Sequence, residues 1–161
     1  MEEQLIYILK THNISYIKID NDESMTRICS LWLNNQPVDV CESIEYLYYG
    51  SYYSNVTKEY DKMEKYYLMA VDIGNSVAMN NLGLYYKNVK KNYDKMKEYY
   101  LMAIDKGDSS TMNNLGYYYS TIEKDYDKMK KYYLMAIENG DSSAMNNLGY
   151  YHQHIDKDYN Q

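Results

Sequence analysis

The sequence predicts an all-α protein, an α-α solenoid of about three and a half 33-residue helix-turn-helix repeats with a helical N-terminal cap. First, the segment Met79–Gly83 (Met-Asn-Asn-Leu-Gly) recurs at Met112 and again at Met145, 33 residues apart each time. Second, the apolar residues of each unit are spaced as on one face of a helix. Third, the 161 residues include 1 proline and 7 glycines, which favours helices over turn-rich sheets.

Residues 1–38 are predicted to form the N-terminal cap. Within them, residues 22–33 carry an apolar stripe at helical spacing and precede a Pro-containing stop. Residues 2–11 are a second candidate helix, whereas residues 14–19 fit either a strand or an extended link. The stripe consists of Met25, Ile28, Cys29, Trp32 and Leu33.

Residues 39–161 are predicted to form the repeat array, which begins with a divergent first helix at residues 39–53. In that helix Leu47 and Tyr48 stand where later copies have asparagines, so it is apolar on a second face. We expect residues 22–33 to cover this face, because a two-helix unit cannot bury its apolar stripe alone.

The second helix of each unit is predicted from a single apolar stripe, with lysines and acids on the opposite, solvated side. Gly107 follows the helix where a left-handed cap is wanted, and Asp108 offers a side-chain oxygen to start the next helix. In the unit with the clearest pattern the stripe is Tyr93, Met96, Tyr100, Ala103 and Ile104.

The first helix of the next unit places Met112, Leu115, Gly116 and Tyr119 on one face. A glycine inside a helix costs about 1 kcal/mol relative to alanine. Because Gly116 recurs at the same phase in every copy, we predict a close approach of two helices at that position.

These positions also form a longer pattern: an alanine, Leu-Gly, a tyrosine, Asp-Tyr, a Tyr-Tyr pair, alanine and glycine. The pattern resembles that of the Sel-one-like repeat (SLR) family, a relative of the tetratricopeptide repeat, over about residues 43–161. The resemblance implies a solenoid whose first helices line a concave face and which assembles complexes or engages host proteins. One copy matches at Ala78, Leu82, Gly83, Tyr86, Tyr93, Tyr99, Tyr100, Ala103 and Gly107, and the next at Thr111, Leu115, Gly116, Tyr119, Asp125, Tyr126, Tyr132, Tyr133, Ala136 and Gly140.

Two departures from the family pattern are visible. The interval from Tyr86 to Tyr93 is short and lacks the Gly-x-Gly stretch of the family's interhelix loop, so we expect a different loop surface. The family's small residue is replaced by methionine in three copies, and Ile104 replaces the second alanine. The composition, rich in tyrosine, asparagine and lysine, resembles the expanded repeat families of giant DNA viruses. The methionines are Met63, Met96 and Met129.

Composition excludes several classes of protein. The net charge of −6 argues against nucleic-acid binding, and no run approaches the roughly 18 apolar residues of a membrane span. The acidic start is wrong for a signal peptide. Two cysteines, Cys29 and Cys41, exclude a disulfide scaffold and fit a reducing compartment, so we expect a cytoplasmic protein, in the host cytoplasm if it is viral.

No catalytic, cofactor or metal site is predicted, and the chain is not expected to be an enzyme. His152 and His154 lie near two aspartates, but side chains two positions apart on a helix point in different directions and a structural metal needs three or four ligands. Cys29 lacks a positioned base, since His12 is the only histidine near it in sequence.

A partner-binding surface is predicted on the side of the first helices opposite the core. Asparagine amides can satisfy an extended peptide backbone, and tyrosine supplies contact area at little entropic cost. Recent duplication of the repeat would also produce this recurrence, so both interpretations stand. The surface consists of an asparagine ladder, Asn81, Asn114 and Asn147, beside Leu84, Tyr117 and Tyr150.

The C-terminal end offers a second contact. The sequence stops at Gln161, just inside what should be another second helix, so the last complete helix lacks its partner. Solenoids normally close with a polar capping helix, and none is visible. Either the end frays or a second chain covers it, which makes self-association through this end the alternative function.

Overall fold

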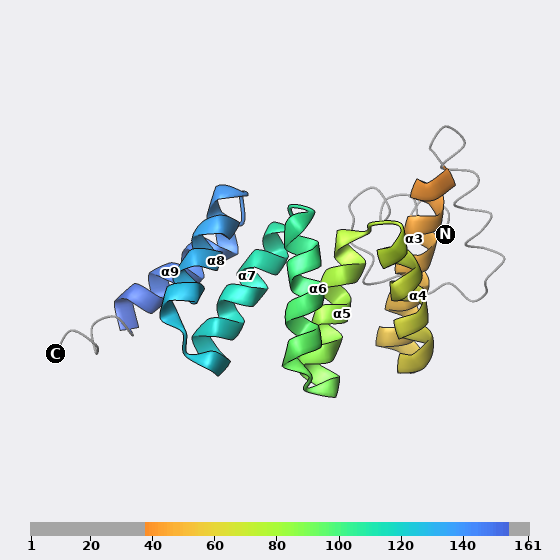
Figure 1. Cartoon of the computed structure of the whole chain (residues 1–161), viewed down its shortest axis with the longest axis horizontal. Coiled ribbons are helices and arrows are strands. Elements are labelled where there is room, and N and C mark those ends of the chain that lie inside the picture. The colour runs from red at the N-terminus through yellow and green to blue at the C-terminus, as the bar shows by residue number, and fades with distance from the viewer. Residues whose placement is uncertain (1–37, 155–161) are drawn as a thin grey trace. The chain divides into compact units, whose positions relative to one another are not determined.

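The structure is a computed structural model in which residues 38–154 are described; the predicted helices at residues 2–11 and 22–33, and the segment 14–19, lie outside this range. All regular secondary structure in the described range is helical, which confirms the all-α prediction (Figure 1). The chain divides into two compact units, Met1–Ala78 and Met79–Gln161. Helices keep the labels of Figure 1.

The described residues of the first unit include one complete helix pair. Helix α3 (Val38–Tyr52) continues into a π-helical turn, η2 (Tyr53–Thr57), and α4 (Tyr60–Asp72) packs against α3. Leu47 and Tyr48 are both buried, as expected of a helix that is apolar on a second face. Their predicted cover, residues 22–33, lies outside the described range.

The second unit repeats this arrangement, and α6 to α9 follow one another in chain order (Figure 1). Two of its first helices, α5 and α7, each continue into a π-helical turn before the second helix begins. The elements are α5 (Ser76–Tyr85, which begins in the first unit), η3 (Tyr86–Lys90), α6 (Tyr93–Asp105), α7 (Ser109–Tyr118), η4 (Tyr119–Glu123), α8 (Tyr126–Glu138) and α9 (Ser142–His154).

The core consists of the predicted stripes. On α6, Met96, Tyr100 and Ala103 are fully buried and Ile104 nearly so, because a 3.6-residue period keeps them on one face. The methionine and the isoleucine that depart from the family pattern are therefore accommodated in the core. The methionines equivalent to Met96, on α4 and α8, are buried as deeply.

The connection between one repeat and the next is the one expected from sequence. Gly107 has φ +82°, a left-handed conformation that glycine adopts without a Cβ clash. Asp108 then caps α7, because its Oδ1 accepts a hydrogen bond from the backbone N–H of Thr111 at 2.8 Å. These two residues end one helix and begin the next.

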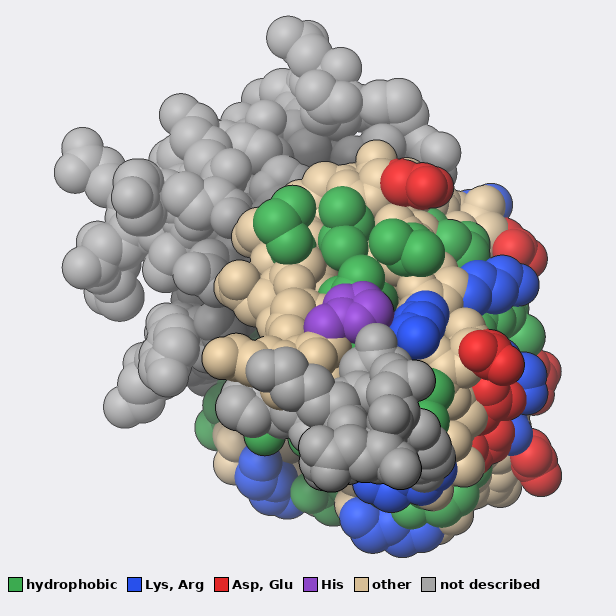
Figure 2. All heavy atoms as spheres, turned by 90° about the vertical axis from the view of Figure 1, so that its left-hand side faces the viewer, with side chains coloured by type: hydrophobic (Ala, Val, Ile, Leu, Met, Phe, Trp, Pro, Cys, Tyr) green, Lys and Arg blue, Asp and Glu red, His purple; other side chains and the backbone are tan. Residues whose placement is uncertain are grey.

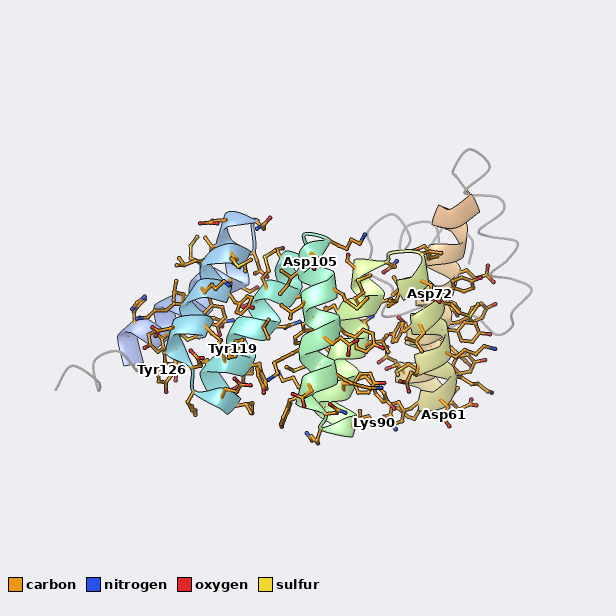
Figure 3. The ribbon with its side chains drawn as sticks, viewed as in Figure 1. Asp61, Asp72, Lys90, Asp105, Tyr119 and Tyr126 are labelled. Carbon is orange, nitrogen blue, oxygen red and sulfur yellow. The ribbon has the colours of Figure 1, made fainter. Side chains whose placement is uncertain are left out.

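The connection between the two helices of one repeat was not predicted. After α5 the chain continues as η3, and the carbonyl of Tyr86 accepts from the N–H groups of both Lys91 and Asn92. Lys91 ends the turn in the left-handed region at φ 53°, and Lys58 and Lys124 do the same in the other copies. The missing Gly-x-Gly stretch is thus replaced by a π-helical turn closed by a lysine. In Figure 3, Lys90 lies before α6 and Asp105 at its opposite end.

The predicted close approach of helices occurs at the recurring glycine. A Cβ placed on Gly116 would lie 2.7 Å from Cδ1 of Tyr133 on α8, nearer than side-chain carbons come in practice. Gly83 meets the ring of Tyr100 on α6 in the same way. The glycine therefore makes room for a tyrosine ring from the second helix of the same repeat.

Candidate functional site

The first helices of the second unit carry no formal charge. Helices α5, α7 and α9 contain no Asp, Glu, Lys or Arg, whereas α6 and α8 carry both acids and lysines. Because charged side chains are strongly hydrated, the surface of α6 and α8 is a typical solvated one. The exposed surface of the first helices is different, since it carries amides, hydroxyls, aromatic rings and apolar side chains such as Val77 and Met145 but no formal charge.

Two tyrosines stand out on these uncharged helices. Tyr117 on α7 is 49% exposed and Tyr150 on α9 is 62% exposed, although both carry large apolar rings. They occupy equivalent positions of successive repeats, and Leu84, half-buried on α5, is their counterpart. The structure thus places these three predicted residues outside the core.

The asparagine ladder connects successive first helices. The Nδ2 group of Asn114 donates to Oδ1 of Asn80 at 3.0 Å, and Nδ2 of Asn147 donates to Oδ1 of Asn113 at 2.9 Å. All four side chains are half-buried, as is that of Asn81. The bonds hold α5 to α7 and α7 to α9. Asn114 and Asn147 therefore have a structural role whether or not they also contact a partner.

Sequence reasoning missed the acceptors of these bonds. Asn80 and Asn113 precede the ladder asparagines in the repeated Asn-Asn pair, so their recurrence was available as a signal. The pattern alone did not say which asparagine of a pair faces the following repeat. That choice depends on how successive first helices are rotated against each other.

Lys87 adds the positive charge that the sequence pattern did not indicate. Its Nζ lies 5.0 Å from the centre of the Tyr117 ring, a cation–π arrangement. The side chain is half-buried, and burial, aided by the charge of Lys91, lowers the pKa of Lys87. The next copy has Ser120 at this position, so no repeated pattern marked it.

The described residues do not bring together a set of metal ligands. Among the side chains that the structure describes, no group of three or more His, Cys, Asp or Glu could hold a metal ion. His152 is exposed with its ring 5.5 Å from that of Tyr151, and the side chains of Cys41 and His154 lie outside the described set, as does Cys29. None of the described helices combines the length and apolarity needed to span a bilayer.

Comparison with known proteins identifies the fold. No protein-family model and no curated protein matches the sequence. The crystal structure of a Sel1 repeat protein from Oxalobacter formigenes is similar, with a TM-score of 0.61 and 19% sequence identity over 94% of this chain and 75% of that one. Together with the 33-residue periodicity and the stacked helix pairs, this likeness shows that the chain has the helical solenoid fold of a Sel1 repeat protein.

Proposed function

We propose that this chain is a non-catalytic scaffold or adaptor that binds a peptide or protein segment on the exposed side of its first helices. The observation that carries the proposal is the exposure of Tyr117 and Tyr150 at equivalent positions of two adjacent, uncharged helices. Exposed tyrosines lose little conformational entropy when a partner covers them and combine an apolar ring with a hydrogen-bonding tip. The proposed contact residues are Asn81, Leu84, Asn114, Tyr117, Asn147 and Tyr150.

The chemistry of this surface favours a neutral, extended segment as ligand. Asparagine oxygens can accept from backbone N–H groups, and Lys87 beside Tyr117 can donate to a carbonyl oxygen. The first helices provide no acidic group for a basic peptide and no arginine for a phosphate. Binding is therefore expected to change little between about 0.1 and 0.5 M salt, because few charges are available for ions to screen.

The test is capture of partners from cell lysate with the intact chain and with a Tyr117→Ser/Tyr150→Ser variant. The asparagines are left in place, because Asn114 and Asn147 also hold the repeats together. A matched control is Leu101→Ser/Leu134→Ser, which removes side chains of 44% and 50% exposure from equivalent positions of α6 and α8.

A protein bound by the intact chain and the leucine variant, but not by the tyrosine variant, would support the proposal. Binding that survives in both variants would contradict it, and the recurrence of these residues would then reflect duplication alone. Circular dichroism of each variant checks that the helices remain formed.

A second candidate function, structural self-association through the C-terminal repeat, is supported by the 59% exposure of Met145 on α9. Light scattering at high protein concentration tests it, and a monomer would contradict it. Either function is compatible with the proposed cytoplasmic location, which rests on the 2 cysteines of the sequence.

A further inference from the structure

The connection from α8 to α9 differs from its counterparts at the residue before its glycine. That glycine follows Ile73 in one copy and Lys106 in the next, but it follows Asn139 in the third. The dipeptide Asn-Gly occurs once in the sequence. Asn139 and Gly140 are both exposed, and a Cβ built on Gly140 meets no described atom within 4 Å. The backbone nitrogen of Gly140 is therefore the least hindered one that follows an asparagine.

We infer that Asn139 is a site of spontaneous deamidation, and that the reaction is limited by opening of the connection between α8 and α9. The Gly140 nitrogen attacks Cγ of the Asn139 side chain, and a five-membered succinimide ring closes. The bond from Cγ to Nδ2 breaks, and ammonia leaves with the proton that the Gly140 nitrogen gives up. Water then adds to either ring carbonyl and opens the ring to aspartate or to isoaspartate, so the reaction requires no oxidant or cofactor.

The folded connection keeps the two reacting groups out of this geometry. The N–H group of Gly140 donates to the carbonyl of Ile137 at 2.9 Å. The Nδ2 group of Asn139 donates to the carbonyl of Met135 at 2.9 Å. Ring closure needs Cβ of Asn139 and the Gly140 nitrogen nearly eclipsed about the Cα–C bond, whereas ψ of Asn139 is 15°, which holds them far from eclipsed. The reaction therefore waits for a local opening that breaks both bonds and frees ψ.

Deamidation should weaken the junction at which it occurs. The Asn139 amide also donates to Sδ of Met112 on α7 at 3.7 Å, so it links the end of α8 to a neighbouring helix. A carboxylate cannot donate, and its charge would face the carbonyl groups at the negative end of the helix dipole. Glu138 and Asp141 beside it are already acidic, and other acidic side chains lie at the surface in the view from the α9 side (Figure 2).

Isoaspartate should have the larger effect, because the chain then runs through Cβ and Cγ and the backbone gains a methylene group. The N–H groups of Gly140 and Asp141 close the connection by donating to carbonyls of α8, both at 2.9 Å. The side chain of Asp141 in turn accepts from the N–H of Ala144 at the start of α9, at 3.1 Å. A longer backbone changes the spacing of these bonds, so the modified chain should hold α9 less firmly. This inference is independent of the proposed function, because none of these residues belongs to the proposed contact surface.

The experiment is to age the full chain in mildly alkaline buffer, both folded and unfolded in urea, and to identify the products by peptide mass spectrometry. Incubation in water labelled with heavy oxygen marks the reaction, because hydrolysis of the ring places an oxygen atom from water in the product. Chromatography separates aspartate from isoaspartate. We expect conversion at Asn139 in both samples, with a rate about tenfold or more higher in urea, because unfolding removes the opening step.

Two variants locate the reaction and the step that limits it. Asn139→Lys copies Lys106 of the preceding repeat and should remove the conversion. Asp141→Ala removes the cap of α9 but keeps Asn-Gly, so it should speed the reaction of the folded chain about fivefold. Dividing each folded rate by the rate of the same variant in urea removes any effect on the intrinsic reactivity of Asn139.

Amide hydrogen exchange measures the consequence for α9. In the aged, folded chain the amides of α9 should exchange faster than in the fresh chain, whereas those of α6 should not change. The Asn139→Lys chain, aged in parallel, is the control and should exchange as it did when fresh.

Three results would overturn the inference. The first is an absence of conversion at Asn139 in both the folded and the unfolded chain. The second is an equal rate in the two samples, which would show that the connection does not limit the reaction; this comparison needs no variant. The third is unchanged exchange of the α9 amides after conversion, which would show that the modified connection holds α9 as firmly as before.

Discussion

The hydroxyl oxygen of Tyr67 on α4 lies 3.2 Å from the hydroxyl oxygen of Ser51 on α3, so the two side chains form a hydrogen bond. In the next repeat Tyr100 takes the place of Tyr67, but Leu84 takes the place of Ser51. The Tyr100 hydroxyl is buried and has no hydrogen-bond partner within the described part of the chain. Burial raises the pKa of Tyr100 well above that of a free tyrosine. Two equivalent tyrosines thus differ by one neighbouring side chain.

Replacing each tyrosine with phenylalanine should therefore have opposite effects. Tyr100→Phe removes a buried hydroxyl that has no hydrogen-bond partner among the described residues, and it should raise the free energy of unfolding by about 1 kcal/mol. Tyr67→Phe loses a hydrogen bond and should lower it by about 1 kcal/mol. Urea unfolding measures both. Equal losses in the two variants would show that the Tyr100 hydroxyl is satisfied in solution.

Supplying the missing partner is the reciprocal test. Leu84→Ser copies Ser51 and should give the Tyr100 hydroxyl a partner. Leu84→Ala removes the same apolar contact without adding a hydroxyl, so it serves as the reference. We expect the free energy of unfolding of the serine variant to exceed that of the alanine variant by about 1 kcal/mol. Helix propensity alone would favour the alanine variant. A more stable alanine variant would contradict this.

The recurring glycine should respond to substitution according to what lies above it. Gly116→Ala drives a Cβ into the ring of Tyr133 and should lower the free energy of unfolding by about 1–3 kcal/mol. Gly149→Ala meets nothing within 4 Å among the described residues, so it should raise stability by up to about 1 kcal/mol through helix propensity. Thermal unfolding of the two variants distinguishes them by sign.

The left-handed lysines are expected to be sites of strain. Lys91→Gly should raise the free energy of unfolding by about 1 kcal/mol, because a left-handed backbone is costly for residues with a Cβ. Lys106→Gly is the matched control, since Lys106 is the C-cap of α6, as Lys91 is of η3, but has φ −91°. There glycine only adds freedom to the unfolded chain and should lower stability by about 0.5–1 kcal/mol. Losses of equal size would argue against strain at Lys91.

The pH dependence of stability should include a contribution from Glu123. Its Oε1 accepts hydrogen bonds from Lys97 Nζ at 2.9 Å and from Tyr118 Oη at 2.8 Å. The bond from Lys97 lowers the pKa of Glu123, and the bond from Tyr118 lowers it further. A carboxyl whose folded pKa is depressed stabilises the fold above its unfolded pKa and loses that effect as pH falls through the folded value.

The expected size is below about 1 kcal/mol, because the ion pair is partly exposed. The advantage of the native chain over Glu123→Gln should therefore be present at neutral pH and vanish in acid. Asp94→Asn serves as the control, since its carboxyl is almost fully exposed and lies 3.9 Å from Lys97. An advantage of Glu123 that is constant from neutral pH to about pH 3 would contradict the assignment.

The repeat pattern predicted most of the fold because each of its signals acts locally or between neighbouring helices of one unit. Helical spacing placed Met96 and Tyr100 in the core, Gly107 ended a helix, and Asp108 began the next. Gly116 marked a close approach because glycine weakens a helix, and a need for space beside the helix accounts for its recurrence at this position. These inferences need no knowledge of how one repeat is oriented against the next.

The candidate surface was predicted less completely, for the opposite reason. The positions of Tyr117 and Tyr150 outside the core followed from helical phase. Which asparagine of each pair bonds to the next helix depends on the rotation between repeats. So does the contact of Lys87 with the Tyr117 ring, and neither is encoded in the spacing of residues along one helix.

The local sequence of this chain was thus sufficient for the helices, their caps and their apolar faces, because backbone hydrogen bonding and side-chain period act over a few residues. Tertiary packing decided the lysine-closed π-helical turns, the asparagine bonds between repeats and the burial of the Tyr100 hydroxyl away from any partner in the part of the chain that the structure describes. Each of these features depends on where a second helix lies. Each contributes only about 1 kcal/mol, so the burial of the apolar stripes, which contributes more, determines how the helices pack.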